Sequence, residues 1–173
     1  GAGLTLTRTI PLVRDRSSDG PASSRGIPNY LAGITIHPSG QFAWVVGKKD
    51  NTTRGTFMSP SLPLESDITV RAQLMLIDLT TNAESVANRL DIDNSESPAA
   101  VAFSPLGDYA FIALQGNAQV AVVDVLDFMD PAAPGTVRTR WGTGIAPQAV
   151  VLNGANGRLY SHDFMGRSVT SFD

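Results

Sequence analysis

The chain has 173 residues, of which 42% are apolar and only 17% are charged, and its formal net charge at pH 7 is −3. Its 13 Lys and Arg residues are scattered, so it lacks the basic footprint of a nucleic-acid-binding protein. No stretch approaches about eighteen consecutive apolar residues, so no membrane span is predicted. The absence of Cys excludes disulfides, thiolate catalysis and covalent haem attachment within these residues.

The first predicted element is a strand within residues 1–13. Apolar and polar residues alternate there, in the run Leu4-Thr5-Leu6-Thr7-Arg8-Thr9-Ile10, as expected for a strand with one covered face. Residues 14–29 then form a long connection to the next strand.

From residue 33 onward the sequence contains three copies of one repeat. Each copy opens with an alternating strand that ends at a turn, in residues 33–40, 100–107 and 149–157. A second strand follows each turn, in residues 42–46, 109–113 and 159–162. A third strand ends each time in aspartate, at Asp78, Asp124 and Asp173. A weaker fourth strand follows in two copies, at 85–92 and 136–141.

Four short antiparallel strands at a period of roughly 40 to 50 residues predict the blade of a β-propeller. The predicted fold class is therefore all-β, with blades in residues 31–92, 98–141 and 147–173. The last blade has only its first three strands, and residues 1–13 are expected to be the outer strand of a blade. Aromatic residues recur at one position of the repeat and are predicted to pack between blades; they are Trp44, Phe111 and Tyr160.

Residues 98–113 followed by 119–124 resemble the YVTN-type repeat of exported seven-bladed propellers. The last copy, residues 158–169, is similar to the final blade of propellers joined to cytochrome-c-peroxidase-like di-haem domains. Residues 49–55 and 69–72 resemble an insertion in the same group. The resemblance implies a periplasmic or extracellular location. It also implies that any haem belongs to a partner domain, so no cofactor is expected in this chain.

Three blades do not close a ring, because propellers have about four to eight. An open arc exposes two apolar blade faces, and exposed patches of that kind predict association. Two interpretations stay open: self-association, as in a dimer forming a six-bladed ring, or a larger propeller whose remaining blades lie outside this chain.

Residues 14–29 and 48–72 are connections that open on the same face of a propeller, and both are long. Long loops on one rim commonly carry binding residues. The candidate binding residues on that face are Lys48, Asp50, Asn51, Arg54, Arg71, Asn117, His162 and Asp163. The competing interpretation is that they are turn residues and solvated loop charges.

Motifs for catalysis are weak. His162 is polar where the other two copies are apolar, but neighbouring strand residues point to opposite faces, so His162 and Asp163 do not easily share a ligand. The run Gly142-Thr143-Gly144 lacks the further glycine and the helix of a phosphate-binding loop. No metal site and no catalytic residue is predicted.

Three functions therefore remain open. The first is a non-enzymatic scaffold that binds a ligand or partner on the face of the long connections. The second is the propeller portion of an exported di-haem peroxidase-like redox enzyme. The third is a metal-dependent propeller hydrolase or lactonase. The chain alone is expected not to be an enzyme.

Overall fold

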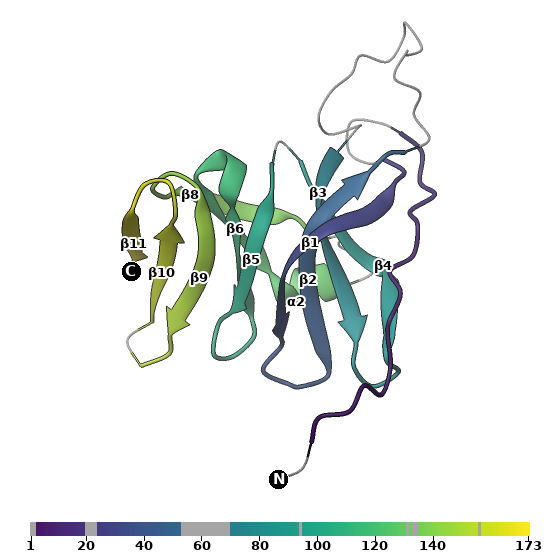
Figure 1. Ribbon diagram of the computed structural model, residues 1–173. Coiled ribbons are helices and arrows are strands. Elements are labelled where there is room, and N and C mark those ends of the chain that lie inside the picture. Colours follow the sequence, from purple (N-terminus) through teal and green to yellow (C-terminus); the bar gives the residue numbers. More distant parts are fainter. Residues whose placement is uncertain are drawn as a thin grey trace, which may run out of the picture.

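Eleven strands form three separate antiparallel sheets in the computed structural model (Figure 1), which describes residues 3–19, 24–52, 70–93, 95–130, 132, 135–155 and 157–173. Blade 1 consists of β1 (Ile27–Ile36), β2 (Phe42–Asp50), β3 (Val70–Asp78) and β4 (Ala83–Ile92). Blade 2 consists of β5 (Pro98–Phe103), β6 (Tyr109–Leu114), β7 (Gln119–Asp124) and β8 (Val137–Gly142). Blade 3 consists of β9 (Pro147–Asn153), β10 (Arg158–Asp163) and β11 (Ser168–Phe172).

Within each blade, strands that are consecutive in sequence pair in the order of the chain, as the repeat predicted. The first strands of the three blades contact one another, β1 with β5 and β5 with β9, so the blades stand side by side around one edge (Figure 1). The all-β prediction of incomplete propeller blades is confirmed. Among the described residues, no helix is long and apolar enough to cross a membrane.

The core lies between the blades, because strand alternation gives each sheet two apolar faces. Trp44 of blade 1 is fully buried against blade 2, and its ring centroid lies 4.7 Å from that of Phe128. Phe111 packs on the other face of blade 2, in a cluster with Leu159 of blade 3. The predicted interblade role is confirmed for Trp44 and Phe111. Tyr160 follows Leu159 in β10, so it faces away from blade 2 and stays partly exposed.

Each blade begins with the same backbone bend. Tyr30, Ser97 and Ala146 all have positive φ angles, of 47°, 48° and 60°. Each lies three residues before the aligned positions 33, 100 and 149. A left-handed residue that is not glycine is uncommon, so its recurrence at one register position shows that the bend belongs to the repeat.

In the part of the chain that the structure describes, two short helices interrupt the strands: η1 (Gln115–Asn117) and α2 (Val125–Met129). Periodicity alone does not predict α2 because it is so short. Asp124 begins it, accepting hydrogen bonds from the backbone N–H groups of Leu126 and Asp127. Asp78 likewise accepts hydrogen bonds from the backbone N–H groups of Thr80 and Thr81.

An outer strand was expected in residues 1–13; of these, the described residues 3–13 form no strand in this structure. Instead, Ile10 and Leu12 pack on the face of blade 1 that points away from blade 2, against Val45 and Met75. A strand needs the edge of another strand to pair with; here residues 3–9 are exposed, and only Ile10 and Leu12 reach the sheet, where they pack on its face.

Candidate functional site

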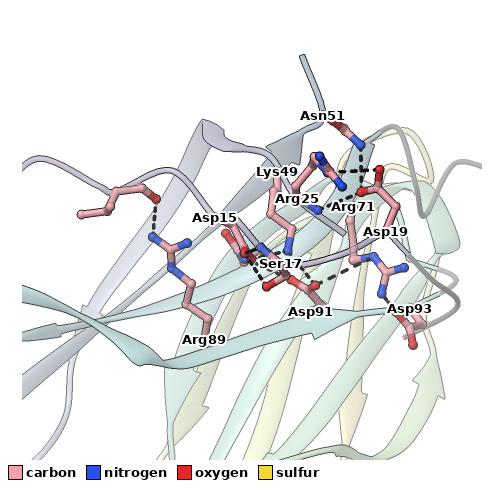
Figure 2. Close-up of polar contacts among 12 residues, drawn as sticks. Asp15, Ser17, Asp19, Arg25, Lys49, Asn51, Arg71, Arg89, Asp91 and Asp93 are labelled. Atoms are coloured by element: carbon pink, nitrogen blue, oxygen red, sulfur yellow. Dashed lines mark hydrogen bonds and ion pairs between the residues drawn. The ribbon is translucent and has the colours of Figure 1, made fainter. Parts of the chain in front are cut away.

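A group of charged residues, in which the cations are buried and the carboxylates are partly exposed, lies at one end of blade 1. The Lys49 side chain is fully buried, and its Nζ atom donates hydrogen bonds to Asp15 Oδ2 and Asp91 Oδ2, both at 2.7 Å (Figure 2). Asp15 precedes β1 and Asp91 lies in β4, so one ammonium group joins the N-terminal segment to the outer strand. We call this group, with Arg71, Gln73 and Asp93, the polar cluster.

The Arg71 side chain of β3 is also fully buried. Its Nη1 atom lies 2.5 Å from Asp93 Oδ1, and its Nε atom lies 4.0 Å from Asp91 Oδ2. Gln73 Nε2 donates to the other oxygen of Asp91 at 2.9 Å. Buried charges are tolerated only when they are paired and hydrogen-bonded, and the two cations of the cluster meet that condition.

The polar cluster follows from strand alternation. In β2, Lys49 falls on the same face as Ala43 and Val45, the face that points away from blade 2. This face is apolar at one end of the sheet, where Ile10 and Leu12 cover it, and charged at the other end.

The N-terminal segment is fixed to blade 1 by further contacts. The Val13 backbone N–H donates to Glu84 Oε2 at 2.6 Å, and Arg89 hydrogen-bonds the Val13 carbonyl while pairing with Glu84. Asp15 and residue 26 exchange two backbone hydrogen bonds. Burial by itself would raise the pKa of Asp15, but hydrogen bonds from Lys49 and Ser17 outweigh it and lower that pKa.

A groove of about 690 Å³ lies beside the polar cluster, between β4 and the start of β8. Its lining contains both charges. Asp91, Asp93 and Arg89 come from β4 and the residues just after it, and Arg140 comes from β8. Arg140 Nη2 donates to the carbonyl oxygen of Asp93 at 2.7 Å, which ties blade 2 to the end of blade 1.

A second buried carboxylate lies in blade 3. Asp163 is fully buried and accepts hydrogen bonds from Thr170 Oγ1 at 2.6 Å, Ser161 Oγ at 2.8 Å and Ser168 Oγ at 3.3 Å. Burial by itself would raise the pKa of Asp163, but these hydrogen bonds and one from the Gly144 backbone lower it. A Cβ atom on Gly144 would lie 2.7 Å from Asp163 Oδ2. Residue 144 is therefore glycine to make room for this carboxylate.

The predicted site residues fall into two classes. Asn51, Arg71 and Asp163 are buried; Asn51 Nδ2 donates to Asp19 Oδ1 at 3.1 Å. The others lie closer to the surface: Lys48 Nζ stands 5.3 Å from the Tyr30 ring centroid, and Asp50 accepts from Asn29 at 2.9 Å.

The remaining candidates that the structure describes come from blades 2 and 3. Asn117 accepts a hydrogen bond from the Glu96 backbone at 2.7 Å, and His162 is exposed on β10. Arg54 lies outside the described residues. Of the candidates, Arg71 is a member of the polar cluster and Asn51 lies beside it (Figure 2), whereas Asn117 and His162 belong to other blades.

Sequence reasoning missed Lys49, Asp15 and Asp91. The alternation of β2 was a usable signal, because it places Lys49 on the face of Ala43 and Val45. Asp15 gave no such signal, since its role depends on the path of the N-terminal segment across the blade. Among the described residues, no group of three or more His, Cys, Asp or Glu could hold a metal ion.

No protein-family model and no curated protein matches the chain. Among solved structures, hydrazine synthase from Kuenenia stuttgartiensis is similar at a TM-score of 0.64 and 18% identity, over 84% of this chain and 45% of that chain. A putative 6-phosphogluconolactonase from Bacteroides uniformis is similar at a TM-score of 0.49 and 14% identity, over 79% of this chain and 34% of that one. This chain thus spans less than half the length of either structure. The similarity to hydrazine synthase shows a shared propeller-type fold.

Proposed function

We propose that the chain is a non-enzymatic interaction module of a β-propeller that binds a partner on the face bearing residues 14–29 and 48–72. The observation that carries this proposal is the exposed ring of Tyr30 at the start of β1, with the Lys48 ammonium 5.3 Å from its centroid. Tyr is among the residues that most often carry the binding energy of protein interfaces, and the adjacent ammonium adds a positive charge that an acidic partner group can pair with.

The polar cluster supports the same proposal, because it makes this end of blade 1 rigid. Lys49 holds the N-terminal segment on the sheet, and Asn29 is fixed by its hydrogen bond to Asp50. A preorganised surface loses less conformational entropy when a partner binds.

The test compares a variant of this face with a matched variant of the opposite face. Tyr30→Ser combined with Lys48→Glu alters the proposed surface, and Gln41→Glu changes an exposed residue in the β1–β2 turn at the other end of the blade. Each protein is immobilised and exposed to a lysate of the source organism, and retained proteins are quantified by mass spectrometry.

We expect proteins retained by the unchanged chain and by Gln41→Glu to be depleted about tenfold with the double variant. Each such protein is then purified and its dissociation constant measured directly. Equal retention by all three chains, with unchanged circular dichroism, would refute binding on this face.

The second candidate function is the propeller portion of a larger redox enzyme. It is favoured by the resemblance of residues 158–169 to the last blade of propellers joined to di-haem peroxidase-like domains. The test is to express the complete gene. This candidate predicts that the gene encodes a Cys-Xaa-Xaa-Cys-His motif and that the purified product carries covalently bound haem. A product with neither the motif nor haem removes this candidate.

We also propose that another blade, from a second copy or from a longer chain, covers blade 1. Ile34 and Ile36 are 70% and 60% exposed on β1. The pairing register makes them equivalent to Val101 and Phe103 of blade 2, which pack on blade 1. The equivalent residues of blade 3 pack on blade 2 in the same way.

A further inference from the structure

The end of blade 2 opposite the long connections carries an extra helix. Blade 1 joins its third and fourth strands by the short turn 79–82, whereas blade 2 uses residues 125–136, which include α2. Figure 1 shows α2 in the lower half of the blades, and the connection between β7 and β8 that contains it leaves the same end of blade 2 as the β5–β6 turn. This elaboration has no part in the function proposed above.

Helix α2 has one buried side and one exposed side. Val125 and Phe128 are buried in the core between blades 1 and 2. Leu126, on the other side, is 72% exposed, and Met129 is also exposed. The helix therefore presents two large apolar side chains that the core does not use.

The neighbouring β5–β6 turn adds another apolar side chain. Leu106 is 84% exposed, at a turn position where blade 1 has Ser39. Tyr109, also exposed, pairs in register with Asp124, the residue that begins α2. The Val125 backbone N–H donates to the Asp108 carbonyl at 2.9 Å, which holds the helix beside the turn. We call Leu106, Leu126 and Met129 the basal patch.

The surroundings of the basal patch are acidic. Residues 104–130 contain no Lys or Arg, but they contain Asp108, Asp124, Asp127 and Asp130. Arg138 of β8 pairs with both Asp124 and Asp127. Four carboxylates and one guanidinium leave a local formal charge of −3 around the apolar side chains.

We propose that the basal patch is a docking surface for a basic amphipathic helix of a partner protein. Leucine-like side chains of such a helix would cover Leu106 and Leu126, and its flanking Lys or Arg residues would face the aspartates. The local negative charge disfavours anionic lipid headgroups, so the occupant is a protein segment and not a membrane surface.

The probe is a synthetic 18-residue helical peptide with Leu on one side and Lys on the other, labelled for fluorescence anisotropy. We expect the full chain to bind it and Leu106→Ser with Leu126→Ser to weaken binding about tenfold or more. Asp127→Asn with Asp130→Asn should reduce the salt dependence of binding. Met165→Ser is the matched control, because Met165 is an equally exposed residue in the connection at the other end of blade 3.

Several outcomes would overturn the proposal. The first is that the Leu/Lys peptide does not bind. The second is that the chain with Leu106→Ser and Leu126→Ser binds this peptide as tightly as the unchanged chain does. The third is that a Leu/Glu peptide binds the unchanged chain as tightly as the Leu/Lys peptide does. Association with vesicles of phosphatidylcholine and phosphatidylglycerol that the two Ser substitutions abolish would identify a membrane site instead. Because both leucines are exposed, these variants should keep the melting temperature of the unchanged chain, which a thermal melt verifies.

Discussion

Asp163 shows how one buried carboxylate can organise a blade end. Three hydroxyl groups, from Ser161, Ser168 and Thr170, surround it, and the Gly144 backbone approaches from the connection before β9. A carboxylate that accepts several hydrogen bonds is stabilised in its charged form even when it is buried. Its charge is therefore part of the fold of blade 3 and is not free for a ligand.

We predict that Asp163→Asn costs about 1–3 kcal/mol of unfolding free energy at pH 7, because an amide cannot accept all these hydrogen bonds. The folded-state pKa of Asp163 is lowered. Its stabilisation is therefore fully present above the unfolded pKa of about 3.9 and is lost as pH falls through the folded value. Urea denaturation measures the unfolding free energies of the unchanged chain and of Asp163→Asn at pH 7 and near pH 3. The difference between these two free energies should be smaller near pH 3. Asp173→Asn, at an exposed carboxylate, is the control, and a difference independent of pH would contradict the prediction.

At the scale of elements, β2 serves two purposes on one face. Ala43 and Val45 form an apolar half that Ile10 and Leu12 cover, and Lys49 forms a charged half that Asp15 covers. One strand thus holds the N-terminal segment by apolar contact at one end and by an ion pair at the other. The unused face of α2 shows the reverse situation, an apolar surface that nothing in the described structure covers.

We predict that Lys49→Met lowers the unfolding free energy by about 2–3 kcal/mol, because it removes the buried ammonium from two mostly buried carboxylates, whose side chains are 15% exposed. Lys48→Met is the matched control; it removes the neighbouring, partly exposed lysine from the other face and should cost less than about 1 kcal/mol. Adding Asp15→Asn to Lys49→Met should recover part of the loss. Urea denaturation measures all three, and equal effects of the two lysine substitutions would show that the polar cluster does not stabilise blade 1.

For the whole molecule, each blade packs one face of its sheet on the opposite face of the next blade, so the two outermost faces are the ones that match each other. Positions equivalent to Ile34 and Ile36 are covered by the preceding blade in blades 2 and 3. The exposed side of blade 3 carries Val151 and Val169, on the face away from blade 2. Head-to-tail contact between two such faces would repeat the existing contacts between blades.

We predict that the chain associates in solution above its 18.3 kDa monomer mass and that Ile34→Thr with Ile36→Thr shifts it toward the monomer. Sedimentation velocity at several concentrations measures the shift. Leu106→Ser serves as the control because it removes an exposed leucine from outside this face. A monomer at all concentrations would count against association through blade 1, as would a dimer that is unchanged in the double variant.

The sequence by itself determined the three repeats, the strand order and the two interblade aromatics Trp44 and Phe111, because alternation and turn residues are local signals. Only the tertiary structure decided that Asn51, Arg71 and Asp163 are buried, and that Ile10 and Leu12 pack on a sheet face in a segment where a strand was expected. It also revealed the pairing of Lys49 with Asp15, which are 34 positions apart. The physical reason is that these features depend on contacts between distant segments, and local periodicity carries no information about which segment covers which face.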